Sequence, residues 1–366
     1  MKGSMPEPRL ALRDSALSRP DWTQSTARDP RLLWLDKNEG NDPELAAIVS
    51  DVMVSLPATT YSTYPDCAPL YRKLASKLGV APENLILTAG ADGAIRSVFE
   101  AYVSPDDTVI HTAPTFAMYS VYTRMFGARS ARLAYTPSNA GPILHAETVV
   151  TAIKSHRPKL VCLPNPDSPT GTVFSPPDLE TIISAAAESG ALILIDEAYY
   201  PFYDHTVITW IERYPQLVVA RSTGKAWGSA GLRIGYAVGS RDVITMLHKV
   251  RPMYEVNSVA VAALERLLDR EDAMLASVAR LNQGKAIFLA AMRDLGFQTL
   301  QGHGNFAHVA FGSRAPAVHR ALSSVAYYRR DFTEPSLVGF SRFSSTTPAL
   351  FERVIDAIRA AVKASA

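Results

Sequence analysis

Cysteine is scarce in this chain, whose 366 residues include only Cys67 and Cys162. Two cysteines cannot build the disulfide framework of a small secreted protein, so we expect a protein of a reducing compartment, the cytoplasm. The chain also lacks an apolar run of the roughly 20 residues needed to span a bilayer. Its N-terminus lacks the apolar core of a signal peptide, and no membrane partner is expected.

An excess of charge of one sign is missing too. Lys and Arg total 37 and Asp and Glu total 35, which gives a formal net charge of +2. Such a balance produces no field that would attract nucleic acid. The histidines His303, His308 and His319 do not have the spacing of metal ligands, so no metal site is expected.

What the chain does have is a large apolar fraction in a regular order. Hydrophobic residues make up 47% of it, and short apolar runs alternate with helix-like segments. The predicted strands are Leu85–Thr88, Thr108–His111, Leu160–Leu163, Ala191–Ile195 and Leu217–Ala220. This alternation predicts an α/β fold with a mostly parallel sheet flanked by helices.

The length of the chain suits one large domain and one smaller domain. We expect a large cofactor domain over residues 44–245 and a small α+β domain that combines residues 1–43 with residues 246–366. One helix should begin at Ser175-Pro176-Pro177, because Pro suits a first helical turn. Another helical stretch should run from about Arg241, with an interruption at Pro252.

Lys225 has the most informative neighbours of any residue in the chain. It lies among hydroxyls, glycines and a second cation in the segment Arg221–Tyr236, just after a predicted strand. Small residues let backbone approach a ligand closely, while Ser222 and Arg233 offer ligands for a phosphate. An amine in such a pocket loses basicity and becomes a nucleophile. This is what the Schiff-base lysine of a pyridoxal-phosphate (PLP) enzyme requires.

A carboxylate follows the preceding predicted strand. Ala191–Ile195 ends in Asp196-Glu197-Ala198-Tyr199, and residues at the carboxyl end of a parallel strand face the ligand crevice. Asp196 would pair there with a protonated pyridine nitrogen, and Tyr199 would hydrogen-bond the phenolic oxygen of the cofactor. The alternative is a helix N-terminus with acidic residues that suit its dipole. Lys225, one strand later, favours the cofactor interpretation.

A glycine-containing segment follows the first predicted strand. Ala89-Gly90-Ala91-Asp92-Gly93 comes directly after Leu85–Thr88, and a helix is expected from Ala94 onward. The order strand, glycine loop, helix places backbone N–H groups at a helix N-terminus, where a phosphate binds well. Taken alone, such a loop is more often a simple turn.

Taken together and in order, these segments resemble the fold-type I PLP-dependent aminotransferases of classes I and II, in particular the histidinol-phosphate aminotransferase-like branch. The resemblance runs from about Leu35 to the final helix. Further matching segments are Leu35–Glu39, Tyr64–Cys67, Pro164–Gly171, Gly231–Tyr236 and Phe340–Pro348. Each segment is weak evidence alone, but the ordered set is specific.

The resemblance implies PLP as the cofactor and a homodimer as the assembly. It implies catalytic roles for Lys225, Asp196 and Tyr199. The residues implied to contact PLP are Ala91, Asp92, Phe116, Ser168, Asp196, Tyr199, Ser222, Lys225 and Arg233, with Tyr64 contributed across the dimer. Phe116 would stack on the pyridine ring; the alternative for any Phe is a place in the core. Arg342 and Arg330 would bind the substrate's anionic ends, and Arg330 is preferred to Arg329 because Arg330-Asp331 matches an Arg-Asp step of the family.

The activity implied is transamination. The amino group of a small amino acid or of a phosphorylated amino substrate would be exchanged with a 2-oxo acid such as 2-oxoglutarate. The partners are therefore a small-molecule amino donor and a keto acceptor. Alternatives on the same scaffold are a decarboxylase of a phosphorylated amino acid and a cyclase or eliminase of specialised metabolism. A catalytically silent PLP-binding protein is a further alternative, because fold alone does not decide function.

The chain departs from the family's pattern in four places. Ser168 stands where Asn is usual, Gly224 where Ser is frequent, and Gly93 where an acidic residue is common. The segment Arg251–Ser258 also differs from the histidinol-phosphate enzymes, and we expect it to line a different substrate pocket.

Overall fold

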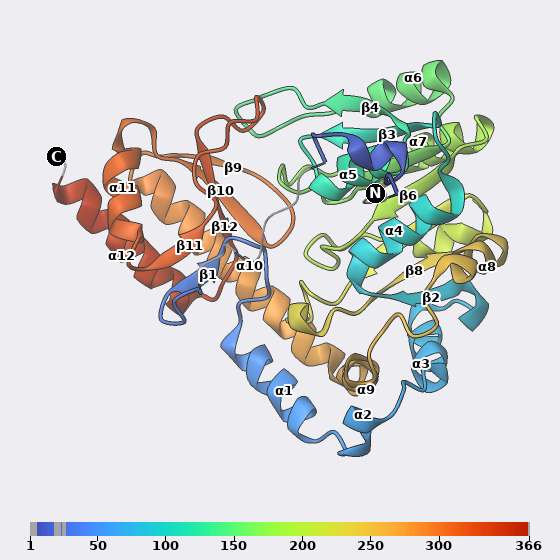
Figure 1. Ribbon diagram of the computed structural model, residues 1–366. Helices are drawn as coiled ribbons and strands as arrows, with labels where there is room; N and C mark the ends of the chain where they lie inside the picture. Colours follow the sequence, from blue (N-terminus) through green and yellow to red (C-terminus); the bar gives the residue numbers. More distant parts are fainter. Residues whose placement is uncertain (1–5, 18–22, 24–26, 365–366) are drawn as a thin grey trace, which may run out of the picture.

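The structure is a computed structural model that describes residues 6–17, 23 and 27–364. Two halves are visible in Figure 1: a large sheet with its helices, and a smaller group of strands and helices that includes the C-terminus. The long helix α10 (Glu271–Asp294) runs between them. The start of the chain, residues 1–5, lies outside the described residues.

The large half is built on a seven-stranded sheet in the order β2-β8-β7-β6-β5-β3-β4. Its strands are β2 (Leu85–Thr88), β3 (Thr108–Ala113), β4 (Arg129–Ala134), β5 (Leu160–Pro164), β6 (Leu192–Asp196), β7 (Leu217–Ser222) and β8 (Gly235–Gly239). β8 runs antiparallel to both neighbours, and the other pairs are parallel. The predicted α/β fold with a mostly parallel sheet is therefore confirmed.

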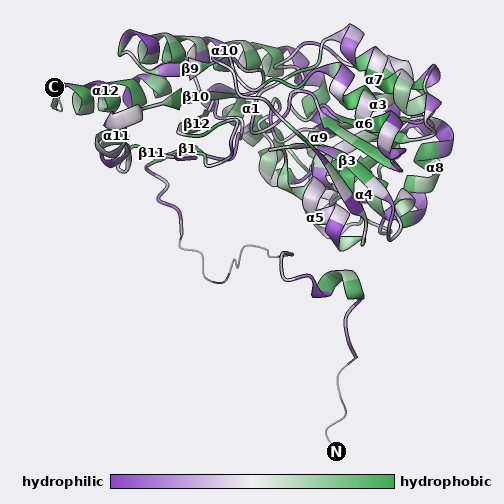
Figure 2. Cartoon of the chain, turned by 90° about the horizontal axis from the view of Figure 1, so that it is seen from above, coloured by the Kyte–Doolittle hydropathy of each residue, from purple (hydrophilic) through white to green (hydrophobic). Residues whose placement is uncertain are grey.

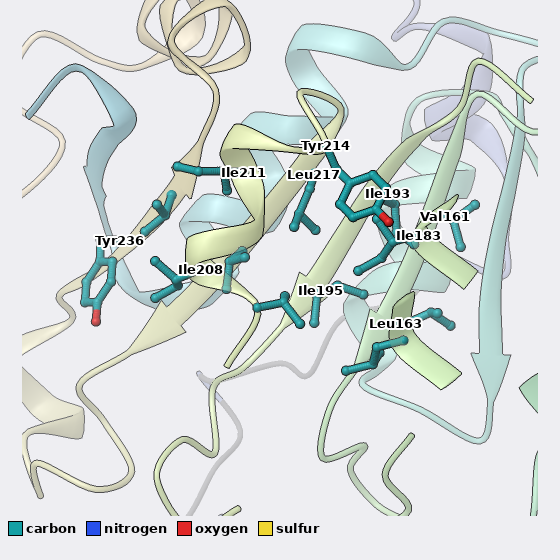
Figure 3. Close-up of a cluster of buried hydrophobic side chains, with 14 of the residues drawn as sticks. Val161, Leu163, Ile183, Ile193, Ile195, Ile208, Ile211, Tyr214, Leu217 and Tyr236 are labelled. Atoms are coloured by element: carbon teal, nitrogen blue, oxygen red, sulfur yellow. The ribbon is translucent and has the colours of Figure 1, made fainter. Parts of the chain in front are cut away.

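Helices cover both faces of this sheet because successive side chains of a strand point to opposite faces. Ile193 and Ile195 pack on one side, against α3 (Ala68–Leu78), α6 (Ala146–His156), α7 (Pro176–Glu188) and α9 (Ser258–Leu267). Leu192 and Leu194 pack on the other, against α4 (Gly90–Tyr102), α5 (Ala117–Met125) and α8 (Arg241–Val250). Figure 3 shows the first cluster, in which each fully buried aliphatic side chain contributes about 1.5–3 kcal/mol.

Local sequence signals account for where the helices begin and end. Ser175 caps α7 by accepting a hydrogen bond from the Asp178 backbone N–H, and Asp178 reciprocates, so a helix starts at Pro176 as predicted. The helix expected from Arg241 ends at Val250, just before Pro252, which has no N–H to continue it. The helix α4 begins at Gly90 rather than Ala94, so Ala91 and Asp92 lie in its first turn.

The smaller half contains two short sheets. One is antiparallel with the order β12-β10-β9, formed by β9 (Gln298–Leu300), β10 (Phe306–Ala310) and β12 (Phe340–Ser344). In the other, β1 (Leu33–Leu35) runs parallel to β11 (Ala326–Tyr328), so that an N-terminal strand joins the C-terminal part. Phe288 of α10 stacks on Phe351 of α12 (Pro348–Ala364) with ring centroids 4.5 Å apart.

The remaining elements are shorter or lie at the edges of the two halves. They are α1 (Pro43–Val54), α2 (Thr59–Ser62), α11 (Ala315–Leu322) and the 3-10 helices Leu10–Arg13, Pro82–Asn84, Ile208–Glu212, Ala230–Leu232, Leu268–Arg270 and Gly312–Arg314. Figure 2 shows green and purple alternating along α10, the pattern of a helix with one buried face. Within the described ranges, no helix combines the length and apolarity that crossing a membrane requires.

Candidate functional site

A cavity of about 780 Å³, measured with its open mouth, lies at the carboxyl ends of β5, β6 and β7. The sequence placed ten residues around PLP, and nine of them line this one cavity. These nine are Ala91, Asp92, Phe116, Ser168, Asp196, Tyr199, Ser222, Lys225 and Arg233, joined by Ile95, Pro164 and Ala198. Their strands end at the same edge of the sheet, which brings together residues that are far apart in the sequence.

The deep end of the cavity holds the buried carboxylate of Asp196, which is 6% exposed. Its Oδ2 accepts a hydrogen bond from the hydroxyl of Tyr119 (2.9 Å), and its Oδ1 accepts one from the backbone N–H of Ala198 (2.9 Å). Burial raises the pKa of Asp196 to about 6, although these two donors lower it. A cation placed beside this carboxylate would restore its ionised form.

Lys225 lies between the two ends of the cavity. Its Nζ donates to the carbonyl oxygen of Lys37 (2.9 Å), a neutral acceptor, and lies 5.7 Å from the ring centre of Tyr199. The preceding residue, Gly224, has little room for a side chain, because an added Cβ would lie 3.1 Å from the Cα of Ala230. The close approach of Ala230 thus accounts for glycine at a position where the family often has Ser.

The open end combines a helix N-terminus with an arginine. Ala91 and Asp92 lie in the first turn of α4, where backbone N–H groups lack intrahelical partners. Arg233 donates through Nη2 to the carbonyl oxygen of Ala89 (3.2 Å), and its Nη2 would lie 3.0 Å from a Cβ added at Gly90. Glycine therefore leaves room at this point for the guanidinium to lie against the start of α4.

Tyr199 and Ser168 lie on the side facing the smaller half. The hydroxyl of Tyr199 accepts a hydrogen bond from Asn38 Nδ2 (2.9 Å). Ser168 Oγ accepts one from Arg342 Nη1 (3.2 Å), while Arg342 Nη2 donates to the carbonyl oxygen of Asp36 (3.0 Å). Burial lowers the pKa of Arg342. The predicted substrate arginine therefore touches a predicted cofactor residue.

The second predicted substrate arginine is placed differently. Arg330 is exposed, and its guanidinium lies 5.7 Å from the ring centre of Tyr328. Arg329 forms the backbone pair with Arg342, and its charge is one that lowers the pKa of Arg342. The structure thus puts Arg329, the residue not chosen, in electrostatic contact with the buried guanidinium, and a substrate role for Arg330 stays a prediction.

Tyr64 is the tenth predicted cofactor residue, and it lies outside the lining of the cavity. Its side chain is 75% exposed and stacks on Tyr254, with ring centroids 4.2 Å apart and planes 7° apart. An exposed position of this kind suits a residue that reaches the cofactor of a second copy of the chain. The resemblance predicts this role for Tyr64, and it stays a prediction.

The structure adds residues to the site for which the sequence suggested no role. Asn38 is buried and has a φ of 55°, a left-handed conformation that Asn tolerates better than most residues. Tyr119 and Tyr122 lie three residues apart on α5, and their hydroxyls bond Asp196 and Asp92 respectively. Their spacing of three residues, which puts both tyrosines on one face of a helix, is the sequence feature that could have identified them.

A second buried carboxylate supports the loops of the site. Asp167 accepts hydrogen bonds from Thr112 Oγ1 (2.6 Å), Thr115 Oγ1 (2.8 Å) and the Tyr135 hydroxyl (2.6 Å). Burial raises the pKa of Asp167 to about 7, although the three hydroxyl donors lower it. Asp167 therefore ties the loop before Phe116 to the loop that carries Ser168.

The donor set of the cavity fits PLP. Asp196 offers a buried carboxylate for a pyridinium nitrogen, and Lys225 offers an amine for the aldehyde carbon. Arg233 and the N-terminus of α4 together form a phosphate-binding cup. Asn38 Oδ1 and Arg342 Nε are buried and have no hydrogen-bond partner among the described residues, so polar ligand atoms would have groups to meet. Among all the residues that the structure describes, no three or more His, Cys, Asp or Glu side chains are placed to hold a metal ion.

Comparison with known proteins gives a consistent answer. Residues 31–358 match the family model described as aminotransferase class I and II. The chain is 33% identical to the histidinol-phosphate aminotransferase of Roseiflexus castenholzii over 341 residues, covering 90% of this chain and 89% of that protein. It is 30% identical to that of Caldanaerobacter subterraneus subsp. tengcongensis over 321 residues, covering 86% and 88%.

Solved structures agree on the fold. The histidinol-phosphate aminotransferase of Sinorhizobium meliloti, solved in complex with pyridoxal-5'-phosphate, superposes with a TM-score of 0.81 at 20% identity, covering 99% of each chain. The family match spans both halves of the molecule and every residue that lines the cavity. This chain belongs to the aminotransferase class I and II family, whose members are PLP-dependent enzymes.

Proposed function

We propose that this enzyme transfers the amino group of a phosphorylated amino substrate, similar to histidinol phosphate, to a 2-oxo acid such as 2-oxoglutarate. The observation that carries the proposal is that Lys225, the Asp196 carboxylate, Arg233 and the start of α4 all line the same cavity. The substrate class is supported by the names of the relatives that match 86–90% of the chain.

The chemistry requires little beyond these residues. Bound PLP supplies an electron sink that stabilises negative charge on the substrate α-carbon. With PLP bound, Asp196 would keep the pyridine nitrogen protonated through its ionised carboxylate. Tyr199, which accepts a hydrogen bond from Asn38, would donate towards the phenolic oxygen. The amine of Lys225 would take the proton from the substrate α-carbon and return it to the carbon that receives the amino group, as general base and acid.

Arg342 is the group we assign to the carboxylate of the 2-oxo acid and of the amino acid formed from it. Its planar guanidinium matches the two oxygens of a carboxylate. Ser168 and the Asp36 carbonyl hold two of its nitrogens, and its Nε has no partner among the described residues. Because burial lowers its pKa, an arriving anion would find a poorly solvated cation. Arg330 is assigned to the phosphate of the phosphorylated amino substrate.

The test of aminotransfer is a half-reaction. Excess glutamate added to the PLP-loaded protein, with no keto acid present, should remove the visible absorbance of bound PLP. A near-ultraviolet band of the amino form of the cofactor should appear in its place. Absence of any visible band on PLP addition would contradict the assignment of Lys225.

A visible band that survives glutamate would point to another donor, or to one of the alternatives. Histidinol phosphate is then the second donor to try. Release of carbon dioxide from a phosphorylated amino acid, without formation of the amino form of the cofactor, would establish decarboxylation instead. An unchanged spectrum with every amine, together with tight PLP binding, would leave only a silent PLP-binding protein.

A second copy of the chain is the partner that we propose for an exposed apolar patch beside the site. Its members and exposed fractions are Val54 (83%), Tyr61 (62%), Tyr64 (75%), Met253 (79%) and Tyr254 (49%). Clustered apolar side chains of this kind mark interaction surfaces. Tyr61 is hydrogen-bonded to the carbonyl oxygen of Met53, which precedes Val54, and Tyr64 stacks on Tyr254, which follows Met253.

The dimer proposal predicts complementation between two defective chains. Lys225→Ala removes the amine from a chain's own cavity, and Tyr64→Ala removes the hydroxyl offered to the partner. In a heterodimer of these variants, one cavity has both defects and the other has none. Isolated heterodimers, purified through two different tags, should therefore show about half the wild-type activity at limiting PLP. A heterodimer no more active than the two parent homodimers would contradict a Tyr64 that acts across the interface.

Cytoplasmic localisation remains part of the proposal. Cys67 and Cys162 are both free, which suits a reducing compartment.

A further inference from the structure

The segment Arg251–Ser258, which departs from the family pattern, lies beside the start of α4. Burial raises the pKa of its residue Glu255, and the nearby backbone N–H of Ala89, the N-cap residue of α4, lowers that pKa. The carbonyl oxygen of Ala89 accepts a hydrogen bond from Arg233 Nη2 (3.2 Å). The Glu255 carboxylate and the Arg233 guanidinium thus both lie next to Ala89.

Glu255 also fills the space beside Gly93. A Cβ added at Gly93 would lie 3.2 Å from Glu255 Oε1. Gly93 is the position at which related enzymes commonly carry an acidic residue, so a carboxylate is still present here but comes from a segment 162 residues later in the chain. The second oxygen, Oε2, is buried and has no hydrogen-bond partner among the described residues.

The segment is held in place at both ends. Arg251 donates to His248 Nδ1 and to the carbonyl oxygens of Pro252 and Met253, each at 3.0 Å. Asn257 caps α9 by accepting the Ala260 N–H at 2.8 Å. These contacts fix the path of the chain on either side of Glu255.

We propose that Glu255 is a positioning residue of the phosphate cup: it replaces the side chain missing at Gly93 and holds the first turn of α4 against Arg233. This inference rests on the proposed function for the identity of the ligand, PLP. Glu255 acts through Ala89 and does not itself touch the phosphate. Removing the Glu255 side chain should therefore change the relative positions of Ala91, Asp92 and Arg233, while all three residues remain present.

The test compares PLP with pyridoxal, which lacks the phosphate. Glu255→Ala should weaken PLP binding to the apoprotein about tenfold, because the Ala89 N–H loses the carboxylate beside it, and should leave pyridoxal binding unchanged. Glu255→Gln keeps an acceptor oxygen of the same reach and should restore PLP affinity to within about threefold of wild type. The matched control is Glu147→Ala, which removes an exposed carboxylate from the first turn of α6 and should alter neither affinity.

A reciprocal pair sharpens the test. Gly93→Glu alone should weaken PLP binding, because its side chain meets Glu255, although glutamate favours a helix more than glycine does. Combined with Glu255→Ala, the same substitution has room for its carboxylate and should recover most of the lost affinity. The Cβ also meets Thr88 at 3.2 Å in both backgrounds, so only the difference between the backgrounds counts.

Additive losses in the double variant would overturn the proposal. So would an equal loss of pyridoxal and PLP affinity in Glu255→Ala, which would indicate a general loss of structure. Both binding constants are measured on the resting protein by absorbance titration. A protein that binds PLP but does not exchange amino groups would refute the proposed function and still decide the role of Glu255.

Discussion

Replacing Lys225 with alanine should lower the turnover number by about 10⁴-fold or more while PLP still binds. The amine has two tasks, nucleophile towards the cofactor and carrier of the proton, and a well-placed general base alone is worth about 10²- to 10⁴-fold. Asp196, Arg233 and the start of α4 remain in this variant, so the noncovalent contacts to PLP persist. Steady-state assays and the content of tightly bound PLP after desalting measure the two effects.

The matched control is Lys154→Ala, which removes an exposed lysine from α6 and should leave turnover unchanged. Borohydride reduction followed by peptide mapping should attach PLP to Lys225 in the wild type. The variant should carry no PLP after the same treatment. Turnover within tenfold of wild type in Lys225→Ala would remove this residue from the mechanism.

Asp196→Asn should have the second largest effect, because it takes away the one charge paired with the pyridine nitrogen. Leaving a buried cation without its partner costs about 3–5 kcal/mol. At 1.36 kcal/mol for each factor of ten, this lowers kcat by about 200- to 5000-fold. Asn keeps one oxygen that can accept the Ala198 N–H, and its NH₂ can donate to the Tyr119 hydroxyl, which can also act as an acceptor, so the fold should be retained. Single-turnover kinetics with glutamate measure the chemical step directly.

Asp196→Asn removes the charge of the side chain and keeps its size and shape. Cofactor binding should lower the pKa of Asp196 from about 6, since a pyridinium cation favours the ionised carboxylate. Asp204→Asn, an exposed substitution eight residues later, serves as the control for charge removal near the site. A full rate in Asp196→Asn would show that the nitrogen does not need to be protonated.

Local patterns predicted most of the fold because they act over short distances. The apolar runs Leu160–Leu163 and Leu217–Ala220 lie inside β5 and β7, and the Ser-Pro-Pro start of α7 has the capping geometry its sequence suggests. The carboxyl ends of parallel strands then meet at one edge, so the site residues named from their order line one cavity. Their individual roles stay predictions.

Contacts between distant segments were beyond the reach of such patterns. Asn38 meets Tyr199 across 161 residues and Tyr119 meets Asp196 across 77, and neither spacing has a local signature. The backbone pair between Arg329 and Arg342 also has no local signature. Adjacent residues beside a strand face opposite ways, and only the pairing register decides which one faces a given neighbour.

The sequence by itself determined the α/β class, which follows from composition and periodicity, and the aminotransferase family, which follows from the resemblance of its ordered motifs. Tertiary structure alone decided which side chains support the chemistry of that family. Glu255 beside Gly93, Asn38 on Tyr199 and Ser168 on Arg342 are contacts set by packing between segments far apart in the chain. Such contacts depend on the relative placement of whole elements, which no short stretch of sequence encodes.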